Sequence, residues 1–331
     1  IFYLYFFICI LFYIIFLIKI FFHRYMLESS YSNFFREKLS ELFNKDELDA
    51  FLEESEKSRP LVIRCNSRLI KRKELSKLLI GRGMDVDGLE WNDSALIIYK
   101  SEVPVGATPE YLAGYYFIQG ASSLLPVLSL DVKENLDILD MCASPGGKTT
   151  YIAELMNNTG TIYANEINKL RIPALANNIQ RMGVTNCIVT QEDALKLEIK
   201  KVDRVLLDAP CSGTGTISKD KNVKNLQKIE FNRLVELQRK LILSGFDKLN
   251  RNGILVYSTC SVFVEENEWV VDYLLRTRKD AKIVDIPVNI GKDGITDYRG
   301  LHFHPSIKKC RRIYPHVHNM DGFFVAKIIK K

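Results

Sequence analysis

The sequence has no CxxC pair, and this absence sets the first limits on its class. Its seven cysteines are an odd number and are scattered along 331 residues. Small disulfide-stabilised domains and zinc ribbons need paired cysteines at short spacing, so neither class fits. The scatter favours a reducing compartment. Charged residues at 26% and aromatic residues at 11% also exclude a disordered, collagen-like or low-complexity chain.

The chain also has little excess of one charge. Its 46 basic and 40 acidic residues leave a net charge of +6. This balance permits a polyanionic partner without requiring one. The length and the hydrophobic fraction of 47% provide for one large domain or two smaller ones.

Residues 1–22 form a long apolar run that only Lys19 interrupts. Its length suits a transmembrane helix. However, the chain opens with Ile1, the first methionine is Met26, and the run consists largely of residues that AT-rich codons specify. We therefore expect residues 1–25 to be an apolar leader created by a gene-model artefact. The alternative is a real anchor or signal, and we expect a membrane partner only in that case.

Residues 26–58 have apolar side chains near helical spacing, which predicts N-terminal helices broken near 44–46. Residues 59–120 predict a small β-α-β module followed by a linker over 102–119 that ends in a helix. The module carries basic side chains that suit either an RNA backbone or a solvated helix face, and both interpretations stay open. These side chains are Arg64, Arg68, Lys71, Arg72, Lys73, Lys77 and Arg82.

From about residue 136, short apolar runs alternate with helical segments. This pattern predicts an α/β fold with a parallel, doubly wound sheet. Ligands of such sheets bind beyond the carboxyl ends of the strands, so the side chains that end the runs should converge on one crevice. The residues at these ends are Asp140, Glu166, Asp193, Asp208 and Cys260.

The first of these runs leads into a glycine-rich turn, CASPGGKT, at residues 142–149. A phosphate-binding P-loop would need glycine where Cys142 stands, which argues against a P-loop ATPase. A dinucleotide fingerprint also fails, because Gly146 and Gly147 are adjacent. A turn that lets a ligand approach a helix N-terminus remains, with a purely structural turn as the alternative. Glu166 could accept ribose hydroxyls and Asp193 could meet an adenine amino group, so together they favour an adenosyl cofactor.

Two cysteines follow neighbouring strand ends, in DAPCSG at 208–213 and STCS at 258–261. A lone cysteine there is usually a small apolar residue, but two beside one crevice need another explanation. The segments DMCASPGGKT, DAPCSGTG and YSTCSVFVEENEWVV resemble the Sun-domain RNA (cytosine-C5)-methyltransferases. FHPSIKKCRRIYPHVHNMDGFF and VPVGATPEYLAGYYFIQGASS are similar to the nucleolar branch that acts in large ribosomal subunit assembly. The resemblance covers roughly residues 59–331.

This resemblance implies a Rossmann-like S-adenosylmethionine-dependent methyltransferase sheet over 121–331, preceded by a small α+β RNA-binding module. It implies S-adenosyl-L-methionine as methyl donor and a cytosine in RNA as acceptor. Cys260 would be the nucleophile that adds to carbon 6 of the base. Asp208 would contact ring nitrogen 3, and Lys148 would stabilise the polarised ring and the thiolate. Cys211 would assist product release, either as the base or as a gate for one.

The resemblance also assigns the cofactor contacts. The turn would hold the methionine end, Glu166 the ribose and Asp193 the adenine, with Arg171 near the cofactor and Asp208 closing the site. Ser144 replaces the alanine usual in relatives, and Glu166 replaces a frequent aspartate. The residues of the turn are Cys142, Ala143, Ser144, Pro145, Gly146, Gly147 and Lys148.

The target cytosine must be unpaired or flipped out to reach such a crevice. We expect large-subunit rRNA or pre-rRNA and pre-60S ribosomal particles as partners, in the nucleus and nucleolus. The loop 219–228 and the cluster 308–312 could contact phosphates or be solvated charge. We expect no metal, and His302, His304, His316 and His318 are interpreted as packing or RNA-facing residues. An alternative is an assembly factor that binds pre-60S particles, with methylation secondary.

Overall fold

The computed structural model describes residues 30–331. The expectations for residues 1–25, including the possible membrane segment, lie outside this range. Within residues 30–331, no helix is both long enough and apolar enough to cross a membrane.

Two short helices, α2 (Asn33–Leu42) and α3 (Lys45–Glu56), begin the described chain. The break between them falls where the sequence predicted it. Each helix has a side-chain cap: Ser32 accepts a hydrogen bond from the Phe35 amide, and Asn44 accepts one from the Glu47 amide. Their apolar faces join an aromatic cluster with side chains from distant parts of the chain, among them Phe231, Phe263 and Tyr314.

A small antiparallel sheet follows, in the order β2-β3-β1-β4. The helix α4 (Arg72–Gly81) packs against one face through Leu75 and Leu79. The prediction of a linker over 102–119 that ends in a helix is wrong. The helix is the short α5 (Pro109–Leu112), and the chain then continues into a strand that pairs with β1. That strand has three residues, too few to show a period in the sequence. The strands are β1 (Leu61–Cys65), β2 (Asp85–Gly88), β3 (Ala95–Lys100) and β4 (Tyr116–Ile118).

The large sheet has the strand order β11-β14-β15-β9-β8-β5-β6-β7, and β10 also pairs with β15. The five strands predicted from the sequence are parallel to one another. They are β5 (Asp137–Asp140), β6 (Thr161–Asn165), β7 (Cys187–Thr190), β8 (Val202–Asp208) and β9 (Leu249–Thr259).

The sheet is mixed rather than wholly parallel, which corrects the prediction. The C-terminal strand β15 runs antiparallel to β9 and carries further antiparallel strands on its other side. A separate two-stranded ribbon lies outside this sheet. The added strands are β10 (Ala281–Val284), β11 (Lys292–Asp293), β14 (Arg311–Ile313) and β15 (Phe323–Lys330), and the ribbon pairs β12 (Asp297–Tyr298) with β13 (Leu301–His302).

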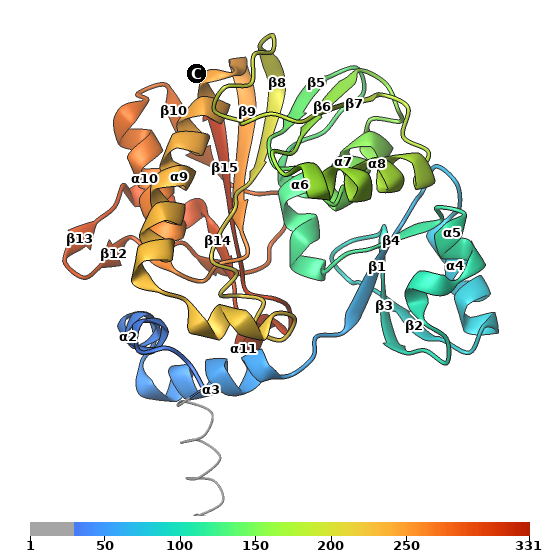
Figure 1. Ribbon diagram of the computed structural model, residues 1–331, viewed down its shortest axis with the longest axis horizontal. Coiled ribbons are helices and arrows are strands. Elements are labelled where there is room, and N and C mark those ends of the chain that lie inside the picture. The colour runs from blue at the N-terminus through green and yellow to red at the C-terminus, as the bar shows by residue number, and fades with distance from the viewer. Residues whose placement is uncertain (1–29) are drawn as a thin grey trace, which may run out of the picture.

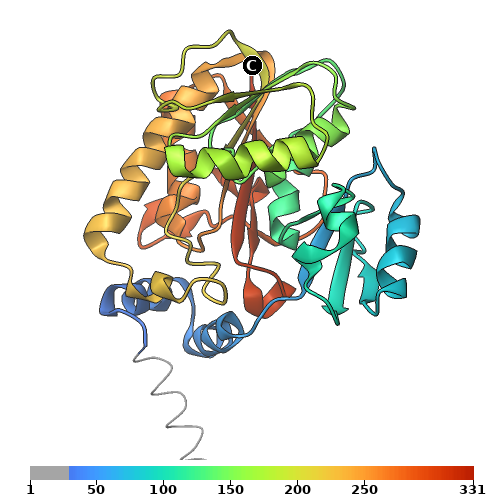
Figure 2. The ribbon, with the colours of Figure 1, turned by 45° about the vertical axis from the view of Figure 1, so that its right-hand side comes forward.

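Helices cover both faces of the large sheet, as the ribbon shows (Figures 1 and 2). Because side chains alternate along a strand, Leu139 packs in the core under α9 and α10, whereas Ile138 packs in the core under α6 and α7. The carboxyl ends of β5, β8 and β9 meet at the edge that faces the small sheet. The helices are α6 (Leu125–Ser129), α7 (Gly147–Leu155), α8 (Ile172–Arg181), α9 (Lys228–Asp247), α10 (Glu268–Thr277) and the short α11 (Pro315–His318).

Candidate active site

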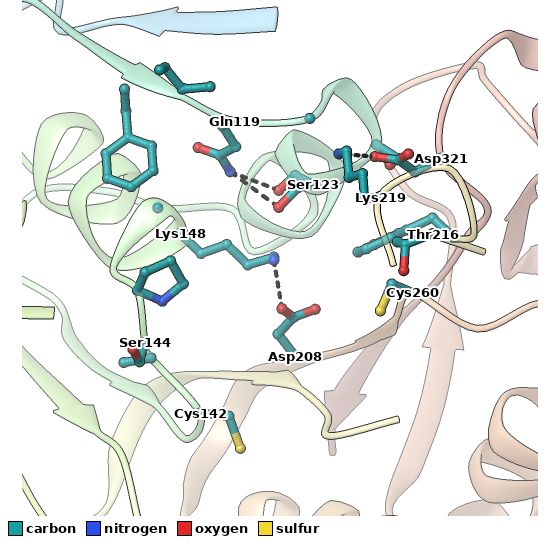
Figure 3. A pocket seen from close by; sticks show the side chains of 18 of the residues that line it. Gln119, Ser123, Cys142, Ser144, Lys148, Asp208, Thr216, Lys219, Cys260 and Asp321 are labelled. Atoms are coloured by element: carbon teal, nitrogen blue, oxygen red, sulfur yellow. Dashed lines mark hydrogen bonds and ion pairs between the residues drawn. The ribbon is translucent and has the colours of Figure 1, made fainter. Parts of the chain in front are cut away.

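A cavity of about 300 Å³ lies beyond the carboxyl ends of β5, β8 and β9. Side chains from all three strand ends line it: Asp140, Asp208 and Cys260. The glycine-rich turn forms one wall, and residues 117–123, which follow the small sheet, form another. Figure 3 shows Lys148 reaching towards Asp208, with Cys260 beside that carboxylate. The predicted convergence of strand ends therefore holds for these three.

The glycine-rich turn leads into α7, which begins at Gly147, inside the segment 142–149. Gly146 has φ +102°, a left-handed conformation that side chains disfavour. A Cβ on Gly147 would lie 3.2 Å from the ring of Phe117, so the neighbouring wall approaches the backbone closely. The turn thus presents backbone to the cavity at a helix N-terminus.

Lys148 and Asp208 form an ion pair inside the cavity. The Lys148 Nζ lies 2.6 Å from Asp208 Oδ2, and Ser258 Oγ donates to Asp208 Oδ1 at 2.8 Å. The ammonium also lies 5.8 Å from the centre of the Phe323 ring. Each oxygen of the Asp208 carboxylate therefore has a partner, and the Lys148 ammonium and the Asp208 carboxylate lie next to Cys260.

The two predicted cysteines lie in contact. Cys211 Sγ is 3.2 Å from Cys260 Sγ. Cys260 lines the cavity, whereas Cys211 is not part of its wall. The hydrogen bond to Cys260, followed by burial, raises the pKa of Cys211 well above its usual range. This shift favours the thiol form of Cys211, which lies next to the cysteine that faces the cavity.

A buried carboxylate holds the two cysteine-bearing loops together. Glu266 accepts hydrogen bonds from the Ser212 amide at 2.8 Å and from Gln238 Nε2 at 3.0 Å. Ser261 Oγ, next to Cys260, lies 2.9 Å from Thr214 Oγ1. Burial raises the pKa of Glu266. Sequence reasoning gave Glu266 no role, and its place in the VEEN segment after Cys260 was the available signal.

Asp140 is a second carboxylate in the cavity, which the sequence placed at the crevice without giving it a role. It lines the cavity, and Thr149 Oγ1 donates to its Oδ2 at 2.7 Å. Its Oδ1 is buried without a hydrogen-bond partner. Burial raises the pKa of Asp140 to about 6. The predicted position of Asp140 at the crevice, from its place at the end of the first strand, is confirmed.

The residues predicted to contact ribose and adenine lie outside the cavity wall. Glu166 is buried, and its Oε2 is 3.3 Å from Arg171 Nη1. Arg171 Nη2 in turn donates to the Ser144 carbonyl at 2.7 Å, so this acid–base pair braces the glycine-rich turn. Asp193 Oδ1 accepts from the Leu195 amide at 3.0 Å and closes a local turn.

Two cations for which the sequence left RNA contact and solvated charge as alternatives are buried, so both interpretations are wrong for them. Arg64 is 0% exposed and lies 3.3 Å from Glu154. Arg312 is 1% exposed and lies 3.3 Å from Glu268. A charge can be buried when a partner charge accompanies it, and sequence alone showed neither partner.

Basic side chains of the loop 219–228 form ion pairs. Lys219 lines the cavity and lies 2.5 Å from Asp321, while Lys221 and Lys224 both pair with Glu56 of α3. Their contacts therefore connect parts of the protein to one another.

The histidines occupy separate environments. His316 packs edge-on against Phe43 and Phe51, and His318 Nδ1 accepts from the Tyr314 amide at 3.0 Å. His302 pairs with an aspartate on the exposed ribbon. Across residues 30–331, no group of three or more histidine, cysteine, aspartate or glutamate side chains could hold a metal ion.

Comparisons with known proteins agree with this architecture. A crystal structure of a methyltransferase homologue from Pyrococcus horikoshii has a TM-score of 0.83 and 34% sequence identity, covering 91% of this chain and 96% of that one. NSun6 from the same organism, crystallised with SFG, has a TM-score of 0.79 and 26% identity, covering 89% and 97%. The mixed sheet and its site thus define an S-adenosylmethionine-dependent methyltransferase fold, as predicted.

Two family profiles match the sequence. One, described as 16S rRNA methyltransferase RsmB/F, matches residues 127–329. The other, described as the N-terminal domain of 16S rRNA methyltransferase RsmF, matches residues 32–121. The chain belongs to the RsmB/F family of rRNA methyltransferases, which confirms the family resemblance seen in the motifs.

Curated relatives distinguish between the branches of this family. The 28S rRNA (cytosine-C(5))-methyltransferase of Mus musculus is 50% identical over 309 residues, covering 91% of this chain and 39% of that protein. The 25S enzyme nop2 of Schizosaccharomyces pombe is 49% identical, covering 91% and 51%. A small-subunit methyltransferase F from Shewanella piezotolerans is 39% identical, covering 86% of this chain and 60% of that protein. The higher identity therefore favours the large-subunit branch. The chain spans about half or less of the length of these two large-subunit relatives.

Proposed function

We propose that this protein transfers a methyl group from S-adenosyl-L-methionine to carbon 5 of a cytosine in large-subunit rRNA. The observation that carries the proposal is the pair of thiols, Cys211 and Cys260, in contact beside the Lys148–Asp208 ion pair. The large-subunit relatives are named for cytosine-C5 methylation of 28S or 25S rRNA.

The residues present fit the cofactor. Asp140 Oδ1 is a buried oxygen without a hydrogen-bond partner, and Glu166 Oε2 is buried with only the ion pair to Arg171 at 3.3 Å; both belong to strand-end carboxylates around the turn. Acidic oxygens in this arrangement suit a ligand with a cationic amino acid end and ribose hydroxyls. When bound, the cofactor supplies an electrophilic methyl group. Residues 142–148 and Asp140 would hold its amino acid end, Glu166 its ribose and Asp193 its adenine, with Arg171 bracing Glu166.

The reaction needs covalent help because carbon 5 of cytosine is a poor nucleophile. Cys260 Sγ bonds to carbon 6 while the bond between carbons 5 and 6 becomes single. The electron pair moves towards ring nitrogen 3, where Asp208 and Lys148 share a proton. Carbon 5 can then accept the methyl group.

Release requires the opposite electron flow. The hydrogen on carbon 5 passes as a proton to Cys211 or to a water that Cys211 admits, the double bond between carbons 5 and 6 re-forms, and the bond from Cys260 Sγ to carbon 6 breaks, leaving Cys260 as a thiolate. Cys211 acts in this release step, since its sulfur lies 3.2 Å from the departing one. The elevated pKa of Cys211 would favour its thiol form beside the departing thiolate.

We place the activity on large-subunit rRNA or pre-rRNA within pre-60S particles in the nucleolus. The names of the relatives support the rRNA substrate. Residues 59–120 would act as the RNA-binding module, with N-terminal helices before it and the methyltransferase domain after it. Residues 26–58 would form those helices, and residues 121–331 would form the catalytic domain.

A trapped adduct tests the proposal directly. The Cys211→Ala protein, incubated with S-adenosylmethionine and a large-subunit rRNA fragment, should yield a protein–RNA adduct that survives a denaturing gel. Cys211→Ala combined with Cys260→Ala should yield none. Cys187→Ala, at a half-buried cysteine on β7, is the matched control and should neither trap RNA nor lose activity. If Cys211→Ala binds the cofactor but forms no adduct, the protein does not methylate that RNA through these cysteines.

A further inference from the structure

A second cavity, of about 510 Å³, adjoins the catalytic one. The two share Gly120, Lys219 and Asp321 in their walls. The second cavity, which we call the flanking groove, lies between the small sheet and residues 318–321, which precede β15. Its size falls within the range of roughly 300–1,000 Å³ that is typical of ligand sites. If one unit of a polymer enters the catalytic cavity, the neighbouring unit can therefore lie in the flanking groove.

The flanking groove is lined by the face of the small sheet that α4 leaves uncovered. Side chains alternate along β3, so Ile98 packs towards α4 whereas Ile97 and Tyr99 point to the groove. Tyr99 is 59% exposed, although it is a large aromatic residue. Trp91, from the turn between β2 and β3, also lines the groove and is partly buried. An open sheet face with aromatic side chains suits the stacking of unpaired bases.

The charges in the groove favour a base over a phosphate. Asp87 and Glu90 lie in its wall and would repel a phosphate, while their oxygens can accept hydrogen bonds from base amino groups. Arg59 also lines the groove, but its side chain is only 6% exposed and is paired with Glu54. Lys219 stands at the junction of the two cavities, where it pairs with Asp321 and keeps its side chain 55% exposed. From there it can also meet the phosphate that joins a base in one cavity to a base in the other.

We propose that the flanking groove binds the base of a nucleotide next to the target cytosine, stacked on Tyr99 and Trp91. This proposal rests on the proposed function, because the target base defines the register. The ligand is single-stranded RNA, since a paired neighbour could not enter the groove. The groove thereby contributes to the choice of target site.

Tryptophan fluorescence offers a direct probe, because the chain has two tryptophans. In the Trp269→Phe protein, Trp91 remains as the sole emitter. The single-stranded rRNA fragment that forms the Cys211→Ala adduct should quench this emission. The same fragment with an abasic residue on one side of the target cytosine should fail to quench the Trp91 emission. An abasic residue on the other side of the cytosine should leave the quenching intact.

Substitution of Tyr99 tests the contribution to affinity. Tyr99→Ala should raise the Kd for the fragment about 10-fold, because it removes the aromatic ring on which one base stacks. Tyr99→Phe keeps the ring and should bind within about twofold of wild type. Tyr273→Ala, at another exposed tyrosine on α10, is the matched control and should bind normally. On the abasic fragment that fails to quench Trp91, Tyr99→Ala should cause no further loss.

The outcomes separate the two proposals. An adduct with Cys211→Ala, together with unchanged binding by Tyr99→Ala and no quenching of Trp91, would overturn the flanking groove and leave the proposed function standing. The absence of any adduct would overturn the proposed function, and the groove as a neighbour of the target base would fall with it. Equal losses for Tyr99→Ala on intact and abasic fragments would also contradict the proposal.

Discussion

At the scale of single residues, the site places groups with different proton affinities within a few ångströms. The hydrogen bond to Cys260, followed by burial, raises the pKa of Cys211 well above its usual range. Its neighbour Cys260 faces the cavity, where Lys148 and Asp208 lie. Two chemically identical side chains can therefore take different roles, and the difference comes from which one reaches the cavity.

Asp140 gives a pH dependence that can be measured in the cofactor-free protein. Burial raises its pKa to about 6, above the usual 3.8, so the folded state keeps a proton that the unfolded state releases. The resulting stabilisation is fully present below 3.8 and is lost as the pH rises through about 6. Between about pH 5 and pH 7.5, wild type should lose about 1 kcal/mol of unfolding free energy relative to Asp140→Asn.

Urea denaturation of both proteins across this pH range measures the difference. Asp93→Asn, at an exposed carboxylate, controls for the removal of one acid. If the wild-type and Asp140→Asn stabilities stay parallel with pH, Asp140 does not titrate in this window.

The sequence predicted that Asp140, Asp208 and Cys260 meet at one cavity, because chemistry-bearing residues end the strands of a recognisable α/β pattern. It gave no role to Asp140 or Glu266, since such a role depends on which oxygens are buried and what they face. It also placed Arg64 and Arg312 on the surface, because a basic residue in a sequence shows no sign of a distant acid. Burial of a charge is a property of the packed molecule, and local spacing does not encode it.

At the scale of secondary structure elements, β1 of the small sheet is bound to the helix that begins at the glycine-rich turn. The guanidinium of Arg64 donates to the Gly147 carbonyl at 2.6 Å and to Thr150 Oγ1 at 2.9 Å, and it lies 3.3 Å from Glu154. Its centre is 4.7 Å from that of the Tyr151 ring. One buried side chain thus fixes the first two turns of α7 relative to the small sheet.

Replacement of Arg64 should be costly for this reason. Arg64→Met leaves the Glu154 carboxylate buried without its partner, which should lower the unfolding free energy by about 3–5 kcal/mol. It should also weaken S-adenosylmethionine binding, because the Gly147 carbonyl loses its donor. Urea denaturation and calorimetric titration measure the two effects.

A second substitution separates charge from packing. Arg64→Met combined with Glu154→Met should recover most of the lost stability, since no buried charge remains. Lys73→Met, at an exposed cation of α4, is the matched control and should change stability little. A loss for Lys73→Met as large as for Arg64→Met would contradict the argument from burial.

Elements also show where prediction from sequence fails. The strands β5 to β9 were recognisable because each is an apolar run bounded by a turn or a reactive residue. The strand β4 was not, because its three residues follow a stretch rich in proline and glycine. The antiparallel strands from β10 onwards were missed because their partners lie in other parts of the chain, and pairing is not a local property.

At the scale of the whole molecule, the N-terminal helices connect distant segments. Phe35 of α2 is fully buried, and its ring lies 5.4 Å from that of Phe263, three residues after Cys260. The same cluster includes Phe231 of α9 and Tyr314 after β14. The N-terminal helices are thus joined to the segments around Phe231, Phe263 and Tyr314 through one apolar cluster behind the loop that carries Cys260.

Because this cluster packs distant segments together, we expect the molecule to unfold cooperatively. Phe35→Ala should lower the unfolding free energy by about 3–5 kcal/mol, because it removes a buried ring from a packed cluster. Phe34→Ala, at the partly buried neighbour in α2, should cost less.

Trp91 in the small sheet and Trp269 on α10 report on the two parts of the molecule, and Trp91→Phe and Trp269→Phe backgrounds isolate each signal. If the molecule unfolds as one unit, Phe35→Ala shifts both transitions equally. A shift at Trp269 alone would show that the small sheet unfolds independently of the cluster.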